Sequence, residues 1–574
     1  MSGLVLRGLA AAGGVAVGRA LVVRDLDPVA DGKGGEAEQT RALEALALVS
    51  AELGKAAERL QALGRLAEAE ILESNRLMAE DPVLAQEVRA LAGEKSAAPA
   101  VLEATERHAL LLLDLPDPLL ASRAADVRRI GRRAARLLSG APALDVPLRP
   151  SILVSRDLGP ADVAELELGA GRIRGIALAE GSATSHAAIM ARSLGLPMVV
   201  GLGPRLLEVS GEEQLVLDGD AGVVVLEPSK STIDLALAAI RRREQERAKL
   251  AAARRFPPTT EDGRRVRLLC NASTNSEVEA GLAAGAEGVG LVRTELAFLE
   301  APDWPSESEL RAALAPVLAP LAGRTATVRT FDFGEDKTPP FLAGVPERGI
   351  ALALAYPDAL AAQLRAILRA GAATRLRVML PLVQRPEDLR AVRALLDESL
   401  AAVEWSGRSP HLGAMIETPQ GAERGVEIAA EADFLSIGTN DLVQYTLGLD
   451  RELPLASALE AADPAVLRLI AQVAAAARER GLDLEICGEA AGEPLLVALF
   501  VGLGIEELSV APARLDDVRA TVRRLSAARA AEGARAALAA ASSEKALEIA
   551  SRLLRAEPRH ERGEVRDGLG GVRA

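Results

Sequence analysis

The sequence is poor in aromatic residues, cysteine and histidine. Phe, Trp and Tyr make up only 2% of its 574 residues, so the cores must be built from Leu, Val, Ile and Ala. Its two cysteines, Cys270 and Cys487, lie far apart and indicate no disulfide framework, which favours a reducing compartment. Histidine is rare enough for each one to be considered separately: His108, His186, His411 and His560.

Long apolar runs and an excess of positive charge are also missing. No stretch approaches the roughly 20 apolar residues of a membrane-spanning helix. Residues 1–20 have the weak apolar character of a signal peptide, but glycines interrupt them at four positions: Gly8, Gly13, Gly14 and Gly18. The net charge of −14 argues against a nucleic-acid partner, which requires a basic face. We therefore expect a cytoplasmic protein with no nucleic-acid partner and no membrane insertion.

The chain is too long for one ordinary core, and its pattern changes along its length. Residues 36–139 carry apolar side chains at helical spacing, which predicts a helical bundle inserted into another domain. Residues 149–227 alternate short strands with short helices. A charged helix predicted over 231–255 is typical of a hinge between two domains. The strands expected in the alternating part are 151–154, 175–178, 198–201, 215–218 and 223–226.

The last half of the chain contains eight apolar segments that alternate with helical stretches. Eight β/α units in this length predict a TIM barrel. The fold class is therefore multidomain α/β, with an inserted all-α bundle and a C-terminal (β/α)8 barrel. The expected barrel strands are 266–271, 288–293, 326–333, 376–382, 412–417, 434–438, 484–488 and 507–511.

His186 stands at the start of an expected short helix. The segment Gly181–Ser185 precedes it with hydroxyl side chains, and Gly195–Pro197 ends the helix. A helix N-terminus favours a phosphate, and a neutral imidazole there can act as a nucleophile. The pattern suits a histidine that becomes phosphorylated, although a lone histidine at a helix start is more often structural.

Polar side chains gather at the predicted ends of the barrel strands, where catalytic residues of such barrels lie. Three arginines could neutralise a substrate that bears phosphate and carboxylate groups. Glu417 and Asp441 are suited to Mg²⁺, and the Cys487 thiol could donate a proton. Each residue could also belong to a plain ion pair. The residues at these ends are Arg293, Arg329, Asp332, Glu417, Asn440, Asp441, Arg451, Cys487 and Glu489.

Several of these segments resemble those of one family, enzyme I of the bacterial phosphotransferase system. This family of phosphoenolpyruvate–protein phosphotransferases belongs to the superfamily of pyruvate phosphate dikinase and phosphoenolpyruvate synthase. The sequence has no ATP-binding domain and no G-x-x-x-x-G-K-[ST] loop, which favours enzyme I within the superfamily. The similar segments are Thr184–Arg192, Gly290–Glu295, Arg329–Lys337, Met415–Pro419, Ser436–Thr446, Asp450–Arg451 and Ile486–Glu489, with Ala124–Gly131 in the insert.

The resemblance implies a domain organisation. Residues 1–20 and 144–228 would form a swivelling phosphohistidine domain, and 21–143 a helical insert that binds the phosphocarrier HPr. Residues 229–257 would be a linker helix, and 258–555 a barrel that binds phosphoenolpyruvate (PEP). Residues 556–574 would be a disordered tail.

The resemblance also implies a reaction. PEP would phosphorylate His186, pyruvate would leave, and His186 would phosphorylate HPr; Cys487 would be the proton donor. Mg²⁺ would bind Glu417 and Asp441, and the protein would be a homodimer. Two alternatives remain: a PEP-using enzyme with another acceptor, and a non-catalytic regulator that senses PEP. The residues expected to bind substrate are Arg293, Arg329, Asn440, Asp441 and Arg451.

The chain departs from the family pattern at four positions. Glu180 adds a carboxylate near the histidine, and Glu335 replaces a usual glycine. Ala351 stands where a second arginine is usual, so a basic contact is expected to be missing. Asn75 stands where a histidine is common in the insert, which bears on how the carrier binds.

Overall fold

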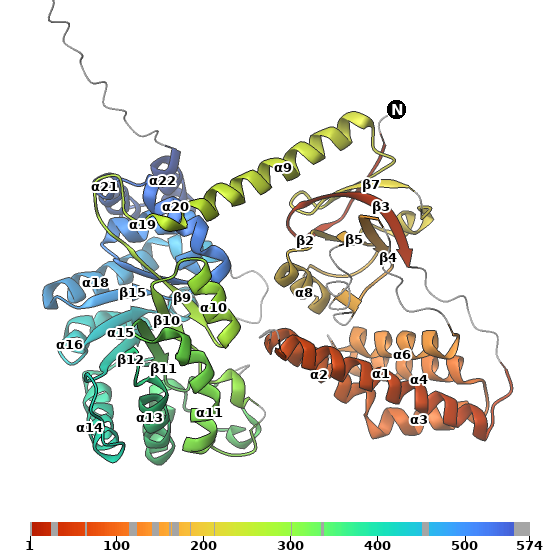
Figure 1. Cartoon of the computed structure of the whole chain (residues 1–574), viewed down its shortest axis with the longest axis horizontal. Helices are drawn as coiled ribbons and strands as arrows, with labels where there is room; N and C mark the ends of the chain where they lie inside the picture. The colour runs from red at the N-terminus through yellow and green to blue at the C-terminus, as the bar shows by residue number, and fades with distance from the viewer. Residues whose placement is uncertain are drawn as a thin grey trace, which may run out of the picture. The chain divides into compact units, whose positions relative to one another are not determined.

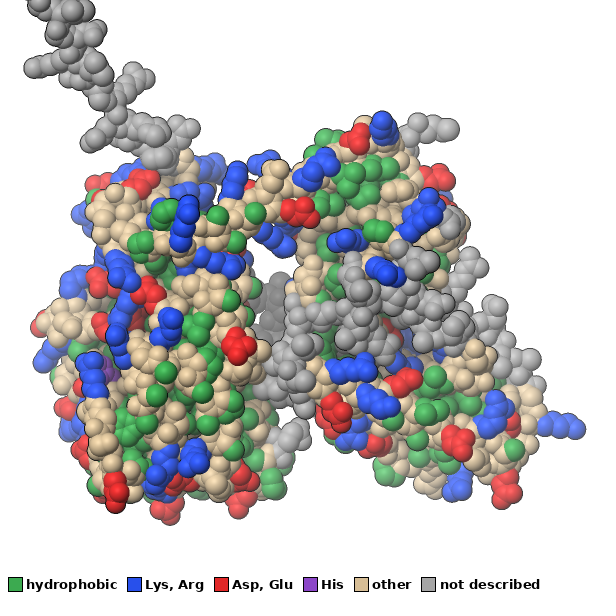
Figure 2. All heavy atoms as spheres, in the orientation of Figure 1, with side chains coloured by type: hydrophobic (Ala, Val, Ile, Leu, Met, Phe, Trp, Pro, Cys, Tyr) green, Lys and Arg blue, Asp and Glu red, His purple; other side chains and the backbone are tan. Residues whose placement is uncertain are grey.

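The computed structural model divides the chain into two compact units, residues 1–248 and 249–574, and each is described by itself (Figure 1). The described residues are 3–23, 32–62, 66–113, 123–140, 149–159, 162–163, 172–183, 185–211, 213–299, 301–334, 338–449 and 458–555. The expected tail, 556–574, lies outside them. Basic and acidic side chains are interspersed over the face of each unit that Figure 2 shows.

The first unit contains an eight-stranded mixed sheet in the order β1-β8-β7-β3-β4-β5-β6-β2. The strands after residue 150 confirm those expected from the sequence, whereas residues 1–20 form three strands instead of one. The strands are β1 (Leu4–Arg7), β2 (Leu9–Ala12), β3 (Val15–Val23), β4 (Ser151–Ser155), β5 (Ile173–Leu178), β6 (Met198–Val200), β7 (Gln214–Asp218) and β8 (Val223–Leu226).

Strands β1 and β2 lie at opposite edges of this sheet, although only Gly8 separates them in the chain. The sheet must therefore curl until its edges approach each other. Gly8 makes this junction possible, because a Cβ atom there would lie 2.3 Å from the carbonyl oxygen of Val200. The Gly8 amide also donates a hydrogen bond to the carbonyl of Gly222, at 2.9 Å.

A helical bundle is inserted between β3 and β4, as the apolar spacing predicted. Helix α3 begins after Asp81, whose carboxylate accepts a hydrogen bond from the Val83 amide at 2.7 Å. Helices α4 and α6 pack closely at Gly131, because a Cβ there would lie 2.0 Å from Thr105 Oγ1. The helices are α1 (Glu36–Ala62), α2 (Leu66–Ala79), α3 (Pro82–Ala92), α4 (Ala97–Leu113) and α6 (Ala124–Leu138).

Two further α-helices are described in the first unit, together with a 3-10 helix at Pro204–Glu208. Helix α8 (His186–Leu194) follows β5 in the chain. Helix α9 (Lys230–Ala252), with a 3-10 turn at Ala253–Arg255, confirms the helix predicted over 231–255 and begins in the first unit. Most of its side chains are exposed.

The second unit contains a closed barrel of eight parallel strands, so the predicted (β/α)8 fold is confirmed. The third strand ends at Arg329, which places Asp332 in the following loop instead of in the strand. The strands are β9 (Arg267–Ala272), β10 (Gly288–Val292), β11 (Thr325–Arg329), β12 (Arg375–Leu380), β13 (His411–Ile416), β14 (Phe434–Ile437), β15 (Asp483–Ile486) and β16 (Glu507–Val510).

Helices surround the barrel (Figure 1). No single described helix is long and apolar enough to cross a membrane; α12 and α13 reach that length and composition only as a pair, bent by 108°. The helices are α10 (Asn275–Ala283), α11 (Glu307–Leu318), α12 (Gly349–Ala355), α13 (Pro357–Gly371), α14 (Pro386–Ala402), α15 (Pro419–Glu423), α16 (Gly425–Ala429), α17 (Thr439–Leu447), α18 (Pro464–Arg480), α19 (Pro494–Leu503), α20 (Leu515–Arg524), α21 (Ala527–Leu538) and α22 (Ser543–Arg555).

The few aromatic residues gather mostly beside one barrel loop. Phe331 and Phe333 stack with ring centroids 4.5 Å apart. Trp304 lies 6.2 Å from the first ring and 6.0 Å from the second. Asp332 lies between the two rings in sequence, and its carboxylate contacts Arg329 and Arg348 instead of the aromatic cluster. The aromatic cluster therefore positions a carboxylate.

Candidate active site

Helix α8 begins at His186, as predicted. Ser185 caps it: the Ser185 hydroxyl accepts a hydrogen bond from the Ala188 amide at 3.3 Å. Gly195 ends the helix with a φ of 65°. The backbone of His186 is described, whereas its side chain and Thr184 lie outside the described residues. The first amides of the helix leave a site that favours negative charge.

The loop before α8 is tied to the sheet. The Arg192 guanidinium donates hydrogen bonds to the carbonyls of Ala183, at 2.9 Å, and Ala11, at 2.7 Å. Glu180, the added carboxylate, forms an ion pair with Arg156 at 3.0 Å. That pairing partly offsets the repulsion between this carboxylate and a phosphate.

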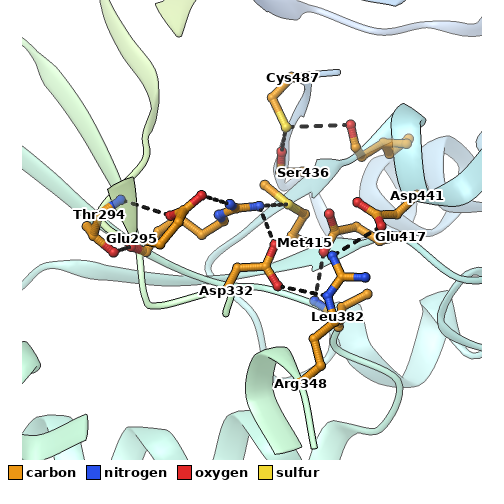
Figure 3. A network of polar contacts seen from close by, with 12 residues as sticks. Thr294, Glu295, Asp332, Arg348, Leu382, Met415, Glu417, Ser436, Asp441 and Cys487 are labelled. Carbon is orange, nitrogen blue, oxygen red and sulfur yellow. Dashed lines mark hydrogen bonds and ion pairs between the residues drawn. The ribbon is translucent and has the colours of Figure 1, made fainter. Parts of the chain in front are cut away.

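Arg329 is held between two carboxylates at the C-terminal end of the barrel. Its guanidinium donates to Glu295 Oε1 at 2.7 Å and lies 2.9 Å from Asp332 Oδ2 (Figure 3). Burial opposes its charge, but the nearby carboxylates prevail and raise the pKa of Arg329 above its ordinary value. This side chain is therefore charged and fixed in orientation.

Arg348 is a second fixed cation that the sequence did not single out. It precedes α12, and its Nε atom lies 3.4 Å from Asp332 while Nη2 lies 3.3 Å from Asp441 (Figure 3). Ala351 stands where the family usually has a second arginine, and it is exposed on α12. Arg348 thus places a guanidinium in the site despite that departure.

Glu417 directly follows β13 and is oriented by a backbone amide. Its Oε2 atom accepts a hydrogen bond from the Leu382 amide at 2.8 Å. Leu382 has a φ of 54°, which is uncommon for a leucine. Burial and the carboxylates of Asp441 and Asp332 raise the pKa of Glu417 well above its ordinary value, against the opposing effect of Arg329.

These charged side chains form one group, here named the rim cluster. Among the described residues it contains two arginines and four carboxylates. The members of the rim cluster are Glu295, Arg329, Asp332, Arg348, Glu417 and Asp441.

The donor set at Glu417 and Asp441 fits a hard divalent cation. A Cβ at Gly438 would lie 2.6 Å from Glu417 Oε1, so the glycine leaves room for that carboxylate. The described residues contain no group of three or more His, Cys, Asp or Glu side chains placed to hold a metal. Mg²⁺ tolerates two carboxylates, because it completes its shell with water and substrate phosphate oxygens.

Cys487 lies directly after β15, and its side chain is 3% exposed. Ser436 Oγ lies 3.4 Å from its sulfur. Burial, followed by the carboxylate of Glu485, raises the pKa of the Cys487 thiol to about 12. At neutral pH the group keeps its proton, which suits a proton donor and not a thiolate nucleophile.

Of the remaining predicted site residues, some have described contacts and others lie outside the described residues. Asn440 Oδ1 accepts a hydrogen bond from the Glu489 amide at 3.0 Å, so part of this side chain holds the loop after β15. Arg293 lines a cavity of about 490 Å³ together with Gly488 and Glu489. Arg451 and Glu335 lie outside the described residues.

Sequence reasoning missed three contributors to the site. Glu295 was visible two positions after Arg293, but nothing in the pattern gave it a role. Arg348 lies between the third and fourth predicted barrel strands, away from any strand end. The Leu382 amide has no sequence signal, because any residue but proline supplies a backbone N–H.

Three family models match successive parts of the chain. The N-terminal model of PEP-utilising enzymes matches residues 7–123, the mobile-domain model 147–222, and the PEP-binding-domain model 247–527. His186 falls in the mobile-domain match, and the rim cluster and Cys487 fall in the PEP-binding match.

Curated relatives align along most of the chain. A phosphoenolpyruvate-protein phosphotransferase of Streptomyces coelicolor is 36% identical, covering 96% of this chain and 99% of the relative. One of Bacillus subtilis is 32% identical, covering 91% and 94%. A multiphosphoryl transfer protein of Rhodobacter capsulatus is 38% identical over 82% of this chain, but the match spans only 58% of that longer protein.

Proposed function

Because the chain belongs to the phosphoenolpyruvate–protein phosphotransferase family of PEP-utilising enzymes, we propose that it transfers the phosphoryl group of PEP to His186, with release of pyruvate. The observation that carries this proposal is the convergence of Arg329, the carboxylates and the Cys487 thiol at one end of the barrel.

The cations of the barrel would bind the substrate. Arg293 and Arg329 can each form bidentate bonds with a phosphate or a carboxylate, and Arg451 would join them. Asn440 would contribute its amide nitrogen, since its oxygen holds the Glu489 loop. Phosphoryl transfer asks the protein mainly for positioning and charge neutralisation, which these side chains supply.

The carboxylates of Glu417 and Asp441 would hold Mg²⁺. When bound, Mg²⁺ neutralises the phosphate oxygens and the developing charge. The raised pKa of Glu417, to which the carboxylates of Asp441 and Asp332 contribute, supports this assignment, because a cation relieves that repulsion.

His186 would attack the phosphorus, and the enolate left behind would take the proton of the Cys487 thiol at its terminal carbon. His186 and the barrel site belong to different compact units, so the transfer requires the two units to meet. The helix start at His186 would then stabilise the phosphate on the imidazole.

The second acceptor would be a histidine of the phosphocarrier HPr, bound at the helical insert. Asn75 is 4% exposed, so this departure from the family lies below the surface of the bundle and does not change what a carrier would touch. We further propose that the protein is cytoplasmic and homodimeric. A different phosphoryl acceptor would leave the first half-reaction unchanged.

Intact-mass spectrometry after mixing the protein with PEP and Mg²⁺ tests the first half-reaction. We expect one acid-labile phosphoryl group on the protein and none on a His186→Ala variant. Absence of added mass on the wild type, with PEP demonstrably bound, would refute the enzymatic proposal and favour a PEP-sensing regulator. Adding HPr, or other acceptors, to the phosphorylated protein then identifies where the group goes.

A further inference from the structure

Strand β15 carries a row of polar side chains inside the barrel. Asp483, Glu485 and Cys487 stand at alternate positions, so they follow one face of the strand extension from the N-terminal to the C-terminal end of the barrel. Asp483 is 49% exposed at its end, whereas Glu485 is 1% exposed and Cys487 3% exposed. A buried carboxylate thus lies two residues from the proposed proton donor.

Ser436 joins these two groups. It pairs with Glu485 across the β14–β15 ladder, and its Oγ atom lies 3.1 Å from Glu485 Oε1 and 3.4 Å from Cys487 Sγ. A hydroxyl has one hydrogen to donate. When Ser436 donates it to Cys487 Sγ, its oxygen can accept the hydrogen of a protonated Glu485, which gives a continuous chain from carboxyl to sulfur. The thiol itself donates to the Ile437 carbonyl oxygen, at 3.7 Å.

The surroundings of Glu485 suit a group that gains and loses a proton. No described donor reaches its Oε2 atom, and a Cβ at Gly290 would lie 2.8 Å from that atom. Burial raises the pKa of Glu485 to about 7, against the opposing effects of Arg377, Ser436 and Arg267.

Other charged groups surround this chain of contacts. Asp483 acts in the same direction as burial on Glu485, Glu507 pairs with Arg377 nearby, and Arg329 and Glu417 act on Cys487 with opposite signs. With these neighbours included, both protonation states of Glu485 are accessible at neutral pH.

We propose that Glu485 is a proton reservoir that returns a proton to Cys487 through the hydroxyl of Ser436. This inference rests on the proposed function. The thiol proton forms a C–H bond with the enolate and leaves a thiolate. Ser436 passes its proton to the thiolate while it takes one from the carboxylic acid of Glu485, which becomes a carboxylate. Solvent at the N-terminal end of the barrel then restores the acid.

That end of the barrel is open to solvent. A cavity of about 400 Å³ lies there, lined by Asp483, Arg377 and His411 among others. Glu485 acts through Ser436 and does not touch substrate, so its role is that of a positioning residue for the proton.

Exchange between PEP and pyruvate tests the reservoir without any carrier protein. Methyl-deuterated, ¹³C-labelled pyruvate is mixed with the enzyme, PEP and Mg²⁺, and mass spectrometry follows two quantities. Appearance of ¹³C in PEP counts reversals of the first half-reaction. Replacement of deuterium by hydrogen in the pyruvate methyl group reports whether the thiol exchanged its deuteron before returning it.

The ratio of deuterium loss to ¹³C exchange isolates the reservoir. We expect a ratio near one for the wild type, falling at least about tenfold in Glu485→Gln and in Ser436→Ala. The wild-type ratio should also fall as pH rises through about 7, the pKa of Glu485. Ser399→Ala is the matched control: this buried serine lies on the outer helix α14, outside the barrel strands that carry Glu485 and Ser436, and should keep the wild-type ratio.

The outcomes separate the two proposals. Wild-type ratios in both Glu485→Gln and Ser436→Ala would overturn the reservoir while the proposed function stands. If Glu485→Gln does not fold, Ser436→Ala decides alone, since it keeps the carboxyl group. Wild-type protein that shows no ¹³C exchange would refute the proposed function, and the reservoir with it.

Discussion

The two ends of the barrel are built from the same residue types but differ in how their charged groups act on one another. The mouth cluster, at the N-terminal end, has two arginines, Arg267 and Arg377, that form ion pairs with two carboxylates, Asp483 and Glu507. The buried Glu485 also acts on Arg377. The rim cluster, at the C-terminal end, has two arginines and four carboxylates in the part of the chain that the structure describes.

The difference shows how a structural charge cluster can be told from a binding site without comparing homologues. In a structural charge cluster, ion pairs between the members neutralise the charges and hold the side chains in place. Both clusters contain a member with a shifted pKa, but the charged neighbours act differently. After burial, the largest effect on the pKa of Glu417 comes from a like charge, Asp441, whereas the largest effect on the pKa of Arg377 comes from an opposite charge, Glu485. A bound cation would relieve the repulsion in the rim cluster. The four predictions below test whether the two ends differ in this way.

Removing one carboxylate from the mouth cluster should give the largest change in stability. Glu507 is 1% exposed and pairs with Arg377 at 2.9 Å and with Arg267. Glu507→Gln should lower the free energy of unfolding by about 3–5 kcal/mol, because it leaves a buried guanidinium poorly compensated. Urea denaturation measures this loss, and Glu506→Gln, at an exposed neighbouring position, should change it by less than about 1 kcal/mol. Equal effects of the two variants would contradict a structural role for the mouth cluster.

Removing a carboxylate from the rim cluster should instead affect activity. Asp441→Asn should slow phosphorylation of His186 by PEP on the order of 10²–10³-fold, the usual cost of one charge-stabilising group. Its unfolding midpoint in the absence of Mg²⁺ should fall less than that of Glu507→Gln, because Arg348 keeps its second carboxylate, Asp332, and one of the carboxylates that repel Glu417 is removed. Rapid-quench phosphorylation assays give the rate, with Asp397→Asn on the exposed face of α14 as control. A variant that loses stability but keeps its phosphorylation rate would show that the rim cluster, like the mouth cluster, has a structural role only.

Glu417 should make the free energy of unfolding of the protein depend on pH. Its pKa in the folded protein is raised above the unfolded value of about 4.5. The folded state therefore binds the extra proton, so the contribution of Glu417 to Mg²⁺-free stability is fully present below about pH 4.5 and is lost as pH rises through the folded pKa. The slope should reach at most about 1.4 kcal/mol per pH unit for each carboxylate of raised pKa.

Denaturation at several pH values measures that slope. Glu417→Gln should reduce it to the share of Glu485, whose pKa is also raised, and Mg²⁺ should reduce it in the wild type, because a bound cation takes the place of the proton. The double variant with Glu485→Gln should flatten it. A slope that survives in the double variant would assign the effect to another carboxylate.

The smallest effect should come from the exposed member of the mouth cluster. Asp483 contacts both arginines of the cluster but is 49% exposed. Asp483→Asn should cost less than about 1 kcal/mol, because solvent screens the pair. A cost equal to that of Glu507→Gln would show that burial does not decide the strength of these ion pairs.

Periodicity predicted the barrel because each strand is a separate apolar segment followed by a helix. The ends of these strands also gave Arg329, Glu417, Asp441 and Cys487, since parallel strands bring their C-terminal ends together. These choices needed only the position of each residue relative to its own strand.

What escaped prediction depends on contacts between distant segments. The curled sheet of the first unit depends on Gly8, whose close approach to Val200 has no local signal. Arg348 enters the rim cluster through tertiary packing, and the aromatic anchoring of Asp332 joins rings from several loops. The left-handed backbone of Leu382 is not favoured by leucine itself, so the surrounding structure imposes it.

The hydrogen bond from the Leu382 amide to Glu417 has a genetic consequence. A mutation at codon 382 alters the side chain but, short of proline, leaves the donor in place. Selection on this contact therefore acts mainly at two neighbouring glycines, which leave room for the two partners. A Cβ at Gly349 would lie 2.9 Å from the Leu382 side chain, and a Cβ at Gly438 would lie 2.6 Å from Glu417 Oε1. In a deep mutational scan, position 382 would accept glycine and asparagine in its left-handed conformation more readily than valine or isoleucine, while both glycines would tolerate almost nothing.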